Sequence, residues 1–275
     1  MTKGLKFVSV GVAFALLIFL GFKSYSYSDT YQKNTYDLIK TKSIENLVES
    51  NTKTLIDTLT FGLISFDEVN KTKELYISQN LNKSKANEYS LYFILVISLL
   101  VLSYFFLSLR VFISIMSIAL LITLFFGLVC PILTVLIQKN ISYIGDVVIS
   151  YESKSILGSI HKLYYNDNII VALIIFCFSV ILPVLKTFCI LFVVLFENKY
   201  TPCVINFFKS IGKWSMADIF VVSILLVFLS LDSNINTKAI IEVGFYFFFV
   251  YVVLSMIVTI LVNRTITQAS SQKFT

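Results

Sequence analysis

Long runs of apolar residues dominate the pattern of the chain, and polar segments of unequal length separate them. The hydrocarbon core of a bilayer is ~30 Å thick, so a helix needs roughly 20 residues to cross it. We therefore predict an all-α membrane protein. Its six transmembrane helices are expected at about Phe7–Phe22, Leu91–Leu109, Val111–Ile137, Ile169–Phe196, Met216–Leu231 and Phe245–Val262.

The polar segment Ser24–Glu88, between the first two runs, is predicted to be helical. Its apolar residues recur at spacings near three, four and seven, which suit amphipathic helices better than strands. It contains no proline and a single glycine, Gly62. We expect an external helical hairpin that turns near Gly62–Asp67, with its second arm running into the second membrane helix. The alternative is a loosely ordered spacer.

The next external loop has a different composition. The stretch "ISYIGDVVISYES" (141–153) mixes Ile, Val, Tyr and Ser around a glycine, which favours short strands. We predict a small external β-hairpin there, followed by a short amphipathic turn at Ile156–Leu163. The single histidine, His161, lies in that turn without a second histidine or a carboxylate cluster, so no metal site is expected.

Composition and charge support this topology. The 275 residues are 57% hydrophobic and 14% charged, which excludes an ordinary water-soluble domain. If the N-terminus is cytoplasmic, the external segments are nearly balanced in charge, whereas the cytoplasmic parts hold one acid, Glu197, against eight bases: Lys3, Lys6, Arg110, Lys199, Lys209, Lys213, Arg264 and Lys273. This positive-inside asymmetry predicts that both termini, including the tail 266–275, lie in the cytoplasm. The net charge of +6 then reflects topology, and no nucleic-acid partner is needed.

Two further patterns narrow the possibilities. The first run lacks a small-x-small cleavage site after it, so we interpret it as an uncleaved anchor. The four cysteines form no Cys-x-x-Cys pair, which argues against a disulfide framework or a zinc site. A Gly-x-Ser-x-Gly elbow, a phosphate-binding glycine loop and a histidine cluster are also missing, so we expect neither an enzyme nor a cofactor.

One base lies inside a membrane run and raises a physical question. Lys186 lies about ten residues, or roughly 15 Å, from the cytoplasmic end of its helix, too deep for its stem to reach water fully. A charge at this depth costs at least ~2.5 kcal/mol on insertion scales. Ser179, Pro183 and Lys186 share one helix face, and Pro183 frees the carbonyl of Ser179 because it has no N–H. We therefore expect the polar groups of this face to contact water or a polar partner. Pro183 is also expected to break its helix, as is Pro131 near the third helix.

The expected partner of Lys186 is Asp218, the only acid in the six runs. Ser215 lies three residues before Asp218 and shares its face. Ser255 and Thr259, four apart in the last helix, would extend the polar track, although hydroxyls also bond back to their own helix. The pair either fixes helix register or changes protonation as the helices move. Residue chemistry leaves both open.

Three stretches resemble the paraquat-inducible protein A family, over about residues 104–265. They are "CPILTVLI", "SILGSIHKLYYNDNIIVALIIFCFSVILPVLK" and "GKWSMADIFVVSILL". The resemblance implies one four-helix membrane domain after an unfamiliar N-terminal unit, residues 1–110. It also implies a transport polar network of Ser179, Lys186, Ser215 and Asp218, with a looser match for Ser255 and Thr259. The family's zinc ribbons and second four-helix copy are missing.

The resemblance also implies a function. Family members are bacterial inner-membrane proteins that act with periplasmic MCE-domain proteins in moving lipids between the two membranes. We therefore expect an MCE-domain partner, phospholipid as cargo and a network that is coupled to protons. Whether the chain acts alone, as a homo-oligomer or with a divergent partner stays open. The alternative is a membrane-anchored sensor or scaffold that acts through Ser24–Glu88.

Overall fold

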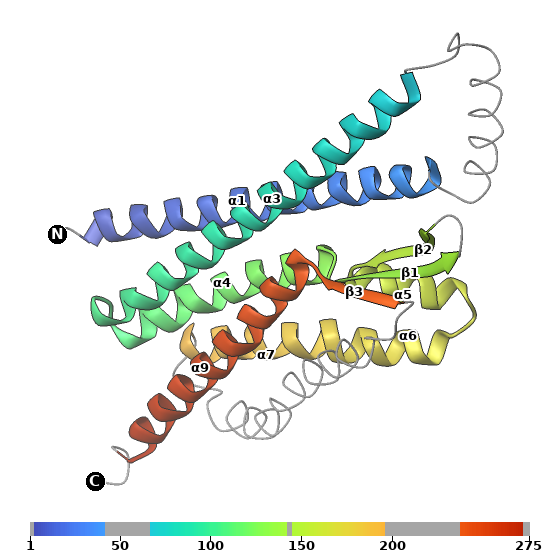
Figure 1. Cartoon of the computed structure of the whole chain (residues 1–275). Coiled ribbons are helices and arrows are strands. Elements are labelled where there is room, and N and C mark those ends of the chain that lie inside the picture. Colours follow the sequence, from blue (N-terminus) through green and yellow to red (C-terminus); the bar gives the residue numbers. More distant parts are fainter. Residues whose placement is uncertain (1–2, 42–66, 142–144, 196–236, 272–275) are drawn as a thin grey trace, which may run out of the picture.

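The structure, a computed structural model, describes residues 3–41, 67–141, 145–195 and 237–271 (Figure 1). Five helices in these ranges are long and apolar enough to cross a membrane. The prediction of a multi-pass, predominantly helical membrane protein is confirmed. The predicted membrane helix at Met216–Leu231 lies outside the described residues.

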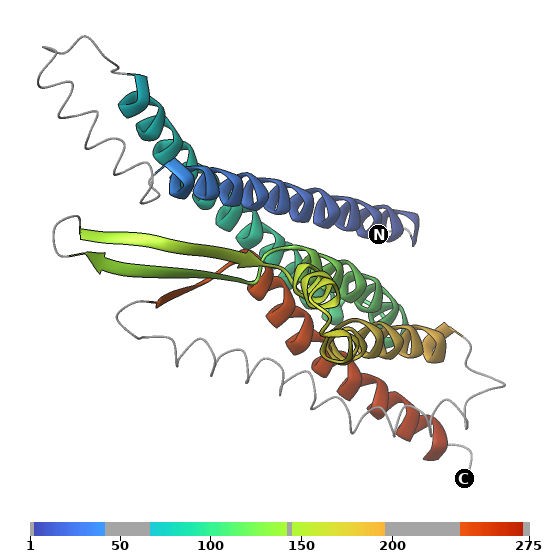
Figure 2. The same cartoon turned by 90° about the vertical axis from the view of Figure 1, so that its right-hand side faces the viewer.

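Two long helices form the N-terminal part of the molecule. They are α1 (Lys3–Thr41) and α3 (Asp67–Leu102), and they cross each other in the two views (Figures 1 and 2). The 39 residues of α1 extend about 58 Å at 1.5 Å per residue, almost twice the thickness of a hydrocarbon core. Both arms of the predicted external segment are thus helical where they are described, and the second arm continues into a membrane helix as predicted. The predicted turn near Gly62–Asp67 lies outside the described residues, except for Asp67 itself.

Polar contacts hold α1 and α3 together beyond their most apolar parts. Ser24 Oγ donates to the carbonyl of Ala86 at 3.0 Å. Further out, Gln79 Nε2 donates to Thr35 Oγ1 at 2.8 Å. Buried polar groups need such partners, so these contacts fix the register of the two helices.

The remaining helices pack side by side in the family-like half of the chain. They are α4 (Leu109–Val129), the nearly continuous α6 (Ile169–Phe176) and α7 (Leu182–Leu195), and α9 (Val243–Ser271). Helix α4 contacts both α7 and α9. The start of α1 and the end of α9 lie at the same end of the molecule, opposite the strands (Figures 1 and 2).

A three-stranded antiparallel sheet lies at the other end. Strands β1 (Leu133–Ile141) and β2 (Gly145–Lys154) form the predicted hairpin, and α5 (Ile156–Tyr165) follows as the predicted amphipathic segment. The sequence analysis missed β3 (Thr237–Ile241), which pairs with β1 and makes the sheet order β2-β1-β3.

The third apolar run is shorter as a helix than predicted. Helix α4 ends at Val129, and Leu133–Ile137 belongs to β1, not to a membrane helix. The physical reason is Pro131, which disfavours a helical conformation of the residue before it. Cys130 accordingly has φ −67° and ψ 149°, an extended conformation. Pro131 thus lies where the helix breaks, as expected.

Aromatic rings join the N-terminal pair to the other helices. Phe93 of α3 packs edge-on against Phe247 of α9, with ring centroids 4.8 Å apart, and against Phe126 of α4, at 6.0 Å. A Cβ added at Gly21 of α1 would lie 2.3 Å from the Phe126 ring, so the missing side chain permits close helix approach. Residues of all four helices therefore share one apolar core.

Candidate functional site

The helix that carries Lys186 is irregular one turn before it. Between α6 and α7, residues Cys177–Ile181 form a π-helical segment, in which the N–H of Leu182 donates to the carbonyl of Cys177. Pro183 follows directly and cannot donate a hydrogen bond. Such π segments occur often at functional sites. The prediction that Pro183 breaks its helix is wrong, because α6, the π-helical segment and α7 follow one another without a gap; the helix changes type before Pro183 instead.

The carbonyl of Pro183 accepts two hydrogen bonds from buried hydroxyls. Thr187 Oγ1 donates to it at 2.9 Å and Tyr251 Oη at 3.2 Å. The two hydroxyl oxygens are 3.4 Å apart, and both side chains are fully buried. A carbonyl oxygen has two lone pairs, so both bonds form together. These hydrogen bonds connect α7 to α9 inside an otherwise apolar core.

Lys186, which lies one turn after Pro183 in α7, also contacts α9. Its Nζ donates to Ser255 Oγ at 3.1 Å, and only 4% of Lys186 is exposed. Ser255 Oγ lies 3.2 Å from the Val252 carbonyl, to which it donates. Thr259 Oγ1 donates to the carbonyl of Ser255 at 2.6 Å. Ser255 thus both bonds back to its own helix and accepts from the lysine.

We call this set the polar cluster: Ser179, Pro183, Lys186, Thr187, Tyr251, Ser255 and Thr259. The structure brings four sequence-predicted residues to neighbouring turns of α7 and α9, and Ser179, only 5% exposed, lies in the π-helical segment before them. Ser215 and Asp218, the other predicted members, lie outside the described residues, so the predicted ion pair stays a prediction.

Sequence reasoning missed Thr187 and Tyr251. A signal was present, because Tyr251, Ser255 and Thr259 follow one another at spacings of four and so share one face of α9. Tyrosine also supplies an apolar ring with a polar end, which makes it suited to a buried contact of this type.

A family profile described as paraquat-inducible protein A matches residues 112–269, more than half of the chain. The chain belongs to the paraquat-inducible protein A family. None of the curated proteins and none of the solved structures matches it.

Every residue of the polar cluster lies within the matched range, from α6 to α9. Helices α1 and α3 lie before it, so they are an addition to the paraquat-inducible protein A unit. Within the cluster, the buried ammonium of Lys186 has three N–H donors and gives one of them to the Ser255 hydroxyl.

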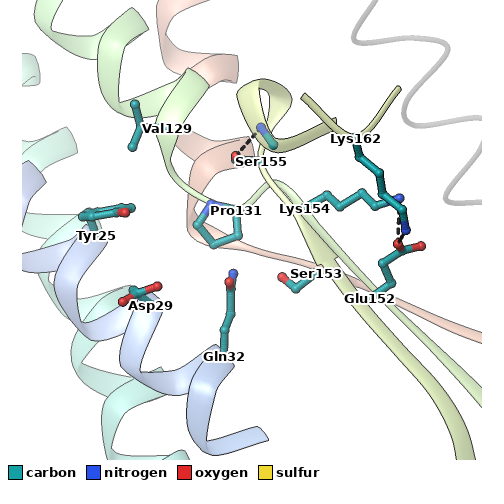
Figure 3. Close-up of a pocket in the computed structure, with 11 residues that line it drawn as sticks. Tyr25, Asp29, Gln32, Val129, Pro131, Glu152, Ser153, Lys154, Ser155 and Lys162 are labelled. Carbon is teal, nitrogen blue, oxygen red and sulfur yellow. Dashed lines mark hydrogen bonds and ion pairs between the residues drawn. The ribbon is translucent and has the colours of Figure 1, made fainter. Parts of the chain in front are cut away.

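A second polar site lies where α1 meets this unit. A cavity of about 400 Å³ opens between α1, the end of α4, β2 and α5 (Figure 3). Its lining is predominantly polar and comprises Tyr25, Asp29, Gln32, Val129, Pro131, Glu152, Ser153, Lys154, Ser155, Gly158 and Lys162. We call it the external pocket, because it lies at the sheet end of the molecule, which the charge pattern predicts to be external.

The charges of the external pocket are paired. Glu152 Oε1 accepts from Lys154 Nζ at 2.9 Å and also from Lys162 Nζ (Figure 3). Hydrogen bonds from Lys162 and then Lys154 lower the pKa of the Glu152 carboxyl below its ordinary value. Across the cavity, Asp29 pairs with Lys33 at 2.6 Å. These exposed pairs orient the lining but add little stability.

The described residues offer no metal centre, because no three His, Cys, Asp or Glu side chains among them lie close together. His161 stacks instead on the ring of Tyr165, with centroids 4.6 Å apart.

Proposed function

We propose that this protein is an inner-membrane subunit of a lipid transport system, with both termini in the cytoplasm. It would act with a periplasmic MCE-domain protein and move phospholipid between the inner and outer membranes, as a transporter subunit and not as an enzyme. Family membership supports the proposal, since this is the role that the resemblance implies. The observation that carries it is the burial of Lys186 against Ser255 inside the family unit.

If this membrane domain served only as an anchor, a buried cation would lower its stability without any benefit. Replacing a buried ionic group by an apolar one is often neutral or stabilising, so structure alone gives little reason to keep the ammonium. Intramembrane ionisable groups instead commonly mark ion pathways and proton relays. We infer that Lys186 is part of a polar network whose protonation or pairing changes during transport.

The first experiment is affinity purification of the tagged protein from its native membranes. Mass spectrometry of one eluate identifies the co-purifying proteins and the bound lipids. An MCE-domain protein together with phospholipid supports the transport proposal. A receptor or signalling partner without lipid contradicts it.

The second experiment tests Lys186 itself, by transfer of labelled phospholipid from vesicles that contain the protein to its MCE-domain partner. Lys186→Met removes the charge and is expected to abolish transfer, whereas Lys186→Arg keeps the charge and should retain part of it. Lys33→Met is the matched control, because the Lys33 side chain is 72% exposed and lies outside the polar cluster. Full transfer by Lys186→Met, at equal abundance in the membrane, would contradict the proposed network.

A second candidate is a sensor or scaffold that acts through Ser24–Glu88, which includes the outer parts of α1 and α3. The length of α1 favours it, since the helix extends well beyond a bilayer core. Replacing residues 42–66 by a flexible linker separates the two candidates, because it leaves the α1–α3 contacts and the polar cluster in place. Retained lipid transfer supports the transporter, and loss of partner binding with an intact cluster supports the sensor.

A further inference from the structure

Glu242 is a buried acid that the polar cluster does not use. It lies between β3 and α9, at the external end of the family unit, and only 4% of it is exposed. Its backbone N–H donates to the carbonyl of Ile132 at 3.0 Å, which fixes its position beside β1. Among the side chains that the structure describes, none of the ion pairs includes Glu242.

Groups of three other elements interact electrostatically with Glu242: Tyr31 of α1, Tyr151 of β2 and Lys83 of α3. The Nζ of Lys83 lies 5.3 Å from the centre of the Tyr31 ring. The Tyr151 hydroxyl is buried close to Thr35 and Ser153. Burial raises the pKa of the Glu242 carboxyl above its ordinary value, against smaller opposite effects of Thr134 and Lys83. A carboxyl in such surroundings is more stable in its neutral form.

Two hydroxyls connect Glu242 to the external pocket. Thr134 Oγ1 lies 2.9 Å from Glu242 Oε1 and 2.9 Å from Ser153 Oγ. Ser153 in turn lines the external pocket (Figure 3). A threonine hydroxyl has one proton, so it donates to one of its two neighbours and accepts from the other.

The hydroxyls of Ser153 and Thr134 can therefore donate either toward Glu242 or away from it. When Glu242 is ionised, Ser153 donates to Thr134, and Thr134 donates to the carboxylate. A proton that enters from water at Ser153 displaces the serine proton to Thr134 and the threonine proton to Glu242. The carboxyl is then neutral and both hydroxyls keep one proton each, so the step balances.

We propose that Glu242 is a proton-binding site that is loaded from the external pocket through Ser153 and Thr134. This inference rests on the proposed transport function, for which it names a proton site on the side opposite the termini. It is separate from the polar cluster, because Tyr251, the cluster residue of α9 that is closest to it in sequence, lies nine residues further along, about 14 Å at 1.5 Å per residue.

The test is infrared difference spectroscopy of the full-length protein in lipid nanodiscs as pH is changed. The wild type is expected to keep the band of a protonated carboxyl at a pH where ordinary glutamates are ionised. Glu242→Gln removes this band, and Glu242→Asp shifts it. Glu74→Gln is the matched control and leaves it unchanged, because Glu74 is exposed on α3 and does not line the external pocket.

The path is tested by hydrogen–deuterium exchange of the same band. Thr134→Val should leave the band in place but slow its shift on transfer to heavy water, since the relay then lacks its middle hydroxyl. A band that persists in Glu242→Gln, or a wild type without one, overturns the proton site, and unchanged exchange in Thr134→Val overturns the path. These measurements require neither lipid transfer nor a partner, so their failure is distinct from failure of the proposed function.

Discussion

Gly244, the second residue of α9, offers a sharp test of the packing. A Cβ added there would lie 2.4 Å from the Cys130 carbonyl oxygen and 2.6 Å from that of Pro131. These are backbone atoms and cannot swing away as a side chain can. The Pro131 carbonyl also accepts the Gly244 N–H at 2.8 Å, which holds the start of α9 against the α4–β1 connection. Gly244→Ala must therefore move one backbone segment away from the other.

The cost follows from three contributions. Overpacking a dense core typically costs about 1–3 kcal/mol, and losing a backbone hydrogen bond costs about 1 kcal/mol. The helical preference of alanine over glycine returns about 0.5–1 kcal/mol. We expect Gly244→Ala to lower the free energy of unfolding by about 2 kcal/mol net.

The assay is reversible unfolding in mixed micelles of mild detergent and dodecyl sulfate, followed by far-ultraviolet circular dichroism. Gly11→Ala is the matched control, because no atom lies within 4 Å of a Cβ added at Gly11 in α1. That variant should be as stable as the wild type or more stable by about 0.5 kcal/mol. Equal stability of the two variants would refute the close approach at Gly244.

Three other variants test polar contacts with the same assay. Tyr251→Phe removes the bond to the Pro183 carbonyl and should cost about 1 kcal/mol; an unchanged stability would contradict the contact. Ser24→Ala removes the α1–α3 bond to the Ala86 carbonyl, with a similar expected loss of about 1 kcal/mol, and a loss far below this would mean that water replaces the bond. The raised pKa of Glu242 means that the folded state holds this proton more tightly than the unfolded state does, so stability should fall as pH rises from the ordinary glutamate pKa through the raised one. Glu242→Gln should remove this fall, and a variant with the wild-type pH dependence would contradict the assignment.

Much of the fold could be predicted from sequence because membrane helices are specified by length and apolarity, which are local properties. The β-hairpin could be predicted for the same reason, because its signal is a glycine among β-branched residues that are close in sequence. The predicted end of the third membrane helix was wrong, because a short apolar run such as Leu133–Ile137 is compatible with both a strand and a buried helix. Strand β3 was missed because its five residues become a strand only by pairing with β1.

The site residues divide in the same way. Lys186 could be recognised because a charge in an apolar run is unusual in any arrangement. Thr187 and Tyr251 could not be paired, since their contact depends on how α7 and α9 pack. Glu242 was counted with the charges of an external segment, and its burial depends on α1 and α3, which are distant in sequence.

Helix α9 connects two regions of the molecule mechanically. Strand β3 ends at Ile241 and α9 begins at Val243, so a single residue separates the sheet from the helix that carries Ser255. Because a helix of this length tilts as a rigid rod, a change of its angle at the polar cluster would displace β3, and a shift of β3 would tilt the rod. Structural changes at Lys186 and at the sheet are therefore expected to occur together, because the rigid helix α9 itself connects the two places.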